Sequence, residues 1–114
     1  MINRAALVVR YRQPFVDWIN AADPSPAART MTLAEANEDS NVYLVEVEDQ
    51  AELEDWLELN HAVLFENELH GWYLDRTLWP SDRSPEQVRR WCIVELHSVV
   101  RDTGVTPIVD DEAL

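Results

Sequence analysis

The sequence contains no lysine, a single cysteine and two glycines among its 114 residues. The lone Cys92 cannot form an internal disulfide, so the chain does not resemble a secreted domain held together by disulfide bonds, and a reducing, cytoplasmic location fits best. Gly71 and Gly104 stand far apart. This spacing excludes the glycine-rich loops that hold phosphates in nucleotide-binding folds, and we expect no cofactor.

Long apolar runs are also missing near the N-terminus. The run from Ala5 to Val9 has five residues. A signal-peptide core needs about 7 to 15 apolar residues and a membrane span about 20. We therefore expect neither a targeting segment nor an association with membranes.

Positive charge is scarce and unevenly placed. Nine arginines face 22 acidic residues, which gives a net charge of −13. Thirteen acids and no arginine lie between Thr30 and Asp75, whereas the rest of the chain holds nine of each. Such a field repels phosphate backbones, so we expect no direct binding of nucleic acid and, among charged partners, basic proteins. A GC-rich genome or a salt-adapted host would explain the same composition without any function.

The apolar content is sufficient for one core. Hydrophobic residues make up 46% of the chain and include five tryptophans. A chain of this length fits one domain. We expect a single globular domain over residues 1–102 and a flexible acidic tail over residues 103–114.

The pattern along the chain predicts three strands, at 5–9, 41–47 and 93–100, and helices near 14–22, 32–37, 49–70 and 84–92. This order indicates an α+β (or small α/β) fold, a two-layer sandwich in which a three-stranded sheet carries helices mainly on one face. The first strand is apolar throughout, so we expect it to be central and buried on both faces. Connections of more than thirty residues permit parallel pairing. A sheet face without helices would suit a homodimer.

The longest predicted helix shows one apolar stripe. At about 100° per residue, the following side chains fall within one arc: Leu53, Trp56, Leu57, Leu59, Val63 and Leu64. Glu58 and His61 on the same helix form a Glu-x-x-His pair. Diiron sites need two such pairs and further glutamates, so we expect a solvated helix face here and no metal.

The last strand carries a second polar pair. Glu95 and His97 alternate with apolar residues and therefore share one sheet face. Two such groups can perform acid–base chemistry. More often, such a pair lines a partly solvated sheet surface and forms structural ion pairs, here with Arg10 or Arg12.

The segment from His70 to Arg83 has no periodicity but holds Trp72, Tyr73, Arg76 and Trp79. An aromatic loop of this length either caps the core or presents the residue types that dominate binding hot spots. Its four residues, with Glu95 and His97, are the candidate binding residues.

Two functions remain open from the sequence. The leading hypothesis is a small acidic protein-interaction or regulatory module without enzymatic activity. The absence of a recognisable catalytic motif favours this module. The alternative is a small enzyme or ligand-binding domain with a pocket between the 70–83 loop and the sheet, which would use Arg76, Glu95 and His97.

Overall fold

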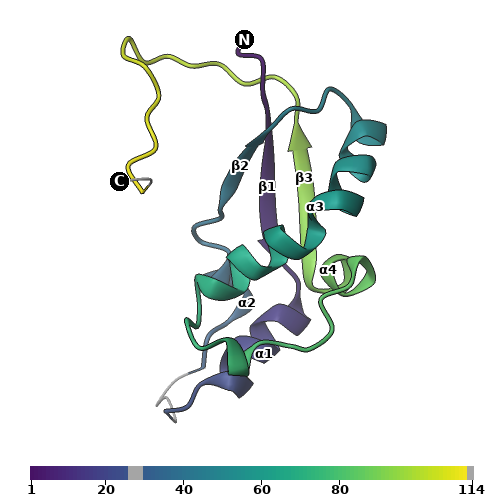
Figure 1. Ribbon diagram of the computed structural model, residues 1–114. Coiled ribbons are helices and arrows are strands. Elements are labelled where there is room, and N and C mark those ends of the chain that lie inside the picture. The colour runs from purple at the N-terminus through teal and green to yellow at the C-terminus, as the bar shows by residue number, and fades with distance from the viewer. Residues whose placement is uncertain (26–29, 113–114) are drawn as a thin grey trace.

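The computed structural model describes residues 1–25 and 30–112. Its helices and strands are, in chain order, β1 Ala5–Tyr11, α1 Gln13–Ala22, α2 Leu33–Ala36, β2 Val42–Val45, α3 Gln50–His70, the 3-10 helix η1 Arg76–Leu78, α4 Pro85–Trp91 and β3 Cys92–His97. The expected α+β fold is confirmed, with three strands in one sheet and α3 lying across it (Figure 1). Residues 26–29, between the helices expected near 14–22 and 32–37, lie outside the described residues.

The sheet has the order β2-β1-β3, so β1 is central as expected. Parallel pairing, however, is wrong, because β1 runs antiparallel to both neighbours. Asn37, which follows α2, exchanges two hydrogen bonds with the backbone of Tyr11. The amide of Arg12 donates to the carbonyl of Trp91 at 2.8 Å. The chain thus returns to the end of β1 before each of the other strands begins, and both must run back along it.

The helix ends follow local sequence signals. The side chain of Thr32 accepts from the amide of Glu35, and the side chain of Glu35 accepts in turn from the amide of Thr32, which forms a capping box at the start of α2. At the starts of α3 and α4, the side-chain oxygens of Asp49 and Ser84 accept from the amides of Glu52 and Gln87. These residues set the starting points of the helices that cover the sheet.

The core lies between the sheet and the helices, on one face of the sheet. Along β1, the buried residues Leu7 and Val9 alternate with the less buried Ala6 and Val8 and with the exposed Arg10. The expectation that β1 is buried on both faces is therefore wrong. In the part of the chain that the structure describes, no helix covers the second face, and the apolar side chains of Val42 and Leu44 in β2 are exposed there.

The apolar stripe of α3 is rotated from the predicted one. Leu53 and Leu64 are buried as expected, and Trp56 and Leu57 are partly buried. Leu59 and Val63 were assigned to the wrong face, because they are 85% and 70% exposed. The remaining buried positions of the helix are Phe65, Glu68 and Leu69.

The segment after β3 leaves the body of the molecule (Figure 1). Residues 101–112 are exposed and contain no helix or strand. Within residues 1–25 and 30–112, no helix is both long and apolar enough to cross a lipid bilayer.

Candidate functional site

The aromatic loop is anchored to the rest of the fold. Trp79 is only 9% exposed, and its indole nitrogen donates to the carbonyl of Tyr73 at 2.9 Å. The hydroxyl of Tyr73 donates to the carbonyl of Ile19 at the end of α1. In the other direction, the indole nitrogen of Trp18 donates to the carbonyl of Leu78 at 3.0 Å. Hydrogen bonds donated by the loop to α1 and by α1 to the loop therefore hold the two together.

The other two loop candidates differ in exposure. The indole nitrogen of Trp72 donates to the hydroxyl of Tyr11 at 3.1 Å, and its ring meets that of Tyr11 edge-on. Arg76 is exposed, and its guanidinium carbon lies 4.8 Å from the ring centroid of Trp79. One guanidinium nitrogen of Arg76 lies 3.6 Å from a carboxylate oxygen of Glu66. Trp72 is thus partly buried and packs against the core, whereas Arg76 is available at the surface.

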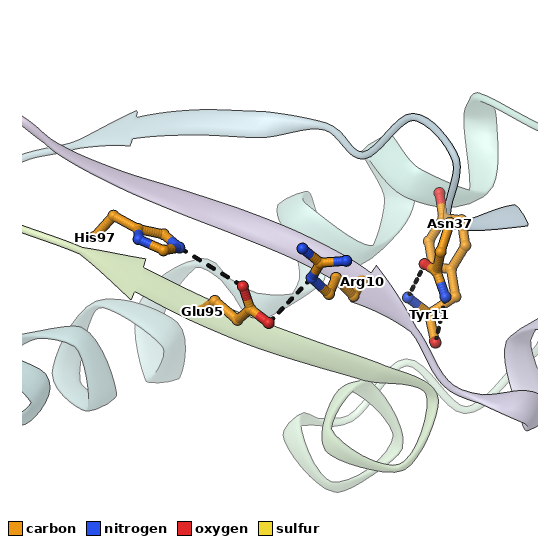
Figure 2. Close-up of polar contacts among 5 residues, drawn as sticks. All are labelled: Arg10, Tyr11, Asn37, Glu95 and His97. Carbon is orange, nitrogen blue, oxygen red and sulfur yellow. Dashed lines mark hydrogen bonds and ion pairs between the residues drawn. The ribbon is translucent and has the colours of Figure 1, made fainter. Parts of the chain in front are cut away.

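The last two candidates lie on the open face of the sheet. Figure 2 shows Glu95 between His97 and Arg10, with one carboxylate oxygen 3.0 Å from the Arg10 guanidinium and the other 3.6 Å from His97. Arg10 is therefore the ionic partner of Glu95, as the sequence suggested. Arg12 instead donates through Nε to the carbonyl of Arg89. The side chains of Arg10, Glu95 and His97 are partly exposed, so each ion pair among them contributes about 0 to 1 kcal/mol to stability.

The six candidates consequently fall into two separate groups. Trp72 contacts Tyr11, which faces the helices, while Glu95 contacts Arg10, which faces the opposite side of β1. Two hollows in the surface lie away from the 70–83 loop. One is at the N-terminal end of β1 and the other lies between α3, α4 and β3.

A buried carboxylate, Glu68, was missed by the sequence analysis. It is 1% exposed and accepts hydrogen bonds from the hydroxyl of Tyr11 at 2.7 Å, from the amide of Asn41 at 2.9 Å and from the hydroxyl of Tyr43. Asn67 donates in turn to the hydroxyl of Tyr43 at 2.7 Å. No arginine pairs with Glu68 among the described residues, so hydrogen bonds alone satisfy its charge.

The phenols around Glu68 remain neutral donors at physiological pH. Burial, followed by the nearby charge of Glu68, raises the pKa of Tyr11 well above its usual range. Burial and the hydrogen bond to Glu68 do the same to the pKa of Tyr43. Because all of these groups are satisfied within the fold, the network joins α3 to β1 and β2 and leaves no group directed at a substrate.

Acidic and sulfur-containing side chains do not gather into a metal site. No group of three or more His, Cys, Asp or Glu residues able to hold a metal ion occurs in the described ranges, 1–25 and 30–112. Cys92 is buried, and burial raises the pKa of its thiol to about 12. A neutral, buried thiol is a poor nucleophile.

The outer face of α3 combines exposed apolar and acidic side chains. Leu59 and Val63 lie one helical turn apart and are the two most exposed large apolar residues of the helix. We define this outer face by its exposed residues, which are Glu52, Asp55, Glu58, Leu59 and Val63. Within the part of the chain that the structure describes, Asp55 and Glu58 form no ion pair.

Comparison with known proteins found no match to this chain among family models, curated proteins or solved structures. Its function must therefore follow from the arrangement of its own residues.

Proposed function

We propose that this chain is a small, non-enzymatic interaction module that holds a basic partner protein on the outer face of α3. The observation that supports this proposal is the exposure of Leu59 and Val63, at 85% and 70%, beside carboxylates that have no basic partner in the described residues. A regulatory role, in which occupancy of this face controls the partner, is consistent with such a module.

The geometry suits a partner segment with the opposite pattern. Apolar residues one turn apart on a helix can insert between the apolar side chains of a second amphipathic helix. The surrounding carboxylates of Asp55 and Glu58 would then face arginine or lysine on the partner. Complementary charge raises the association rate and rejects acidic partners, and the apolar pair supplies the contact that excludes water.

The net charge of −13 acts in the same direction. Among the thirteen acids from position 30 to position 75, ion pairs with arginine involve Glu46, Glu54 and Glu66 in the described part of the chain. Many of the other acids keep their charge exposed, and the summed field attracts cationic surfaces over distances comparable with the Debye length.

The other two surfaces support a binding role less well. In the aromatic loop, most of the ring surface and all indole nitrogens are used within the fold. The open sheet face would be the contact of a homodimer. A seven-residue strand in a three-stranded sheet gives a face of roughly 24 Å by 14 Å. That is well below the ~800 Å² that each partner contributes to a stable interface, so a dimer through this face alone would be weak.

The proposal includes a cytoplasmic location. The chain has one cysteine, and the buried thiol of Cys92 has no partner for a disulfide within the chain. A domain without disulfides is typical of a reducing compartment.

The proposal can be tested with matched variants. Wild-type protein, the double variant Leu59→Ser/Val63→Ser and the control Val42→Ser/Leu44→Ser would each be used to capture partners from native extract, followed by mass spectrometry. The control pair is also exposed but lies on the open sheet face. We expect a basic protein that the wild type and the control retain and the α3 variant loses.

The captured protein would then be purified and its affinity measured against all three chains. We expect the α3 variant to bind at least about tenfold more weakly and the affinity to fall with added salt. Equal affinities of the α3 variant and the wild type, or a partner that binds independently of salt, would contradict the proposal.

A further inference from the structure

A hollow of about 290 Å³ lies between α3, α4 and β3, away from the outer face of α3. Its apolar lining includes Leu53, Val88 and Cys92, which are buried, and Leu57, which is partly buried. This volume is close to the lower end of ligand pockets, about 300 to 1,000 Å³. The hollow is therefore large enough for a small apolar molecule.

Basic side chains stand at the margin of this hollow. Arg12 from the junction of β1 and α1, and Arg89 from α4, both line it. Arg89 pairs with Glu54 of α3 at 3.4 Å, which compensates that carboxylate. The Nε of Arg12 donates to the carbonyl of Arg89 at 3.1 Å, which restrains the position of the Arg12 guanidinium.

Arg12 differs from most arginines of this acidic chain. Six of the other arginines that the structure describes pair with carboxylates, and these are Arg4, Arg10, Arg76, Arg83, Arg89 and Arg90. The seventh, Arg101, lies in the exposed segment after β3. No carboxylate lies within ion-pair distance of Arg12 in residues 1–25 and 30–112. A cation that stays unpaired among so many acids, at the margin of an apolar hollow, is suited to an anionic ligand.

We propose that this hollow binds a small apolar carboxylate, with its carboxylate on the Arg12 guanidinium and its apolar part on Leu53, Leu57 and Val88. The free nitrogens of a guanidinium match the geometry of a carboxylate. The apolar part of the ligand is removed from water when it packs against these side chains. Burial of this apolar surface contributes most of the affinity. This site goes beyond the proposed interaction on the outer face of α3 and does not depend on it.

The same chemistry has two natural sources. One is a free aliphatic or aromatic acid, and the other is the C-terminal carboxylate of a peptide with an apolar last residue. Both present one carboxylate next to an apolar group, so the Arg12 contact alone does not distinguish them. Matched probes do.

The test uses nuclear magnetic resonance titrations of the full chain. The probes are octanoate, its uncharged counterpart octanol, and a short peptide ending in leucine, as a free acid and as an amide. We expect one of the two carboxylates to bind saturably, with shifts at Leu53 and Val88, and its uncharged counterpart to bind at least about tenfold more weakly. Binding of octanoate identifies a free acid as the ligand, and binding of the peptide acid alone identifies a peptide terminus.

Variants distinguish binding at this site from nonspecific binding of apolar molecules. Arg12→Gln should weaken binding of the carboxylate at least about tenfold, while Arg10→Gln, on the open face of β1, should leave its affinity unchanged. Leu57→Trp should block the hollow from its margin, and thermal melting would verify that each variant is folded. The proposal fails if no carboxylate probe binds saturably, if the uncharged counterpart binds equally well, or if folded Arg12→Gln binds like the wild type.

Discussion

The hydroxyl of Tyr11 donates a 2.7 Å hydrogen bond to the carboxylate of Glu68, and this bond joins the end of β1 to the last turns of α3 across 57 positions of sequence. Both side chains are buried. A charge inside an apolar core is costly unless hydrogen bonds satisfy it, so this contact and those from Asn41 and Tyr43 determine whether Glu68 can stay there. The network thereby fixes the position of α3, on which both proposed binding surfaces depend.

Tyr11→Phe should destabilise the protein measurably. The substitution removes one donor to Glu68 and the acceptor of the Trp72 indole nitrogen. Hydrogen bonds to charged groups contribute about 1.5 to 3 kcal/mol, and we expect the free energy of unfolding in urea to fall by that amount. Glu58→Gln, an exposed position, is the control and should change it by less than about 0.5 kcal/mol. Similar values for the two variants would show that the network contributes little.

Stability should fall as the pH rises above about 9. The folded-state pKa values of Tyr11, Tyr43 and Cys92 are all raised, that of Cys92 to about 12. The unfolded chain therefore releases these protons at a lower pH than the folded chain does. Each group then reduces the free energy of unfolding by about 1.4 kcal/mol per pH unit, between its unfolded and its folded pKa. The chain has no lysine, so no ammonium side chain titrates in this range.

Urea unfolding measured from about pH 8 to pH 11 would check this dependence. Tyr43→Phe and Cys92→Ala should each reduce the slope, the latter from the lower pH at which a thiol normally ionises. A free energy of unfolding that stays constant over this range would contradict the burial of these groups.

The rotated stripe of α3 also gives a stability prediction. Leu53→Ala leaves a cavity at a buried position and should cost about 2 to 5 kcal/mol. Val63→Ala, one of the residues that the sequence wrongly placed in the core, should cost less than about 0.5 kcal/mol because that side chain is exposed. Chemical denaturation of both variants tests the assignment, and a larger loss for Val63→Ala would reverse it.

Local signals in the sequence predicted most of the elements. The caps Thr32, Asp49 and Ser84 lie where side-chain oxygens accept from backbone amides, a contact that depends only on neighbouring residues. The direction of β2 and β3 depends instead on the end of β1 to which the chain returns before each strand begins. The bonds between Asn37 and Tyr11, 26 positions apart, set that return and leave no periodic pattern in the sequence.

The polar core was less predictable than the apolar one. The arc of α3 was chosen from apolar residues alone, so a buried carboxylate could not be part of it. Glu68 does follow Leu64 by four positions and precedes Leu69, which places it on the buried face. That spacing was the available signal, but burial of a glutamate is rare unless partners satisfy it, and those partners come from β1 and β2.

Moderate salt should raise the melting temperature of the wild type. The ion pairs of the described residues lie at least partly in solvent, and each is worth about 0 to 1 kcal/mol, so screening them costs little. The excess acids repel one another, and salt screens that repulsion over a Debye length of about 10 Å at 0.1 M. Melting would be followed at pH 7 from about 20 to 500 mM sodium chloride. Asp55→Asn/Glu58→Gln should melt higher than the wild type at low salt and respond less to added salt, because it removes two carboxylates that form no ion pair with the described residues. A flat or falling trend in the wild type would mean that the acids are already neutralised within the fold, and the proposed attraction of a basic partner would lose its electrostatic basis.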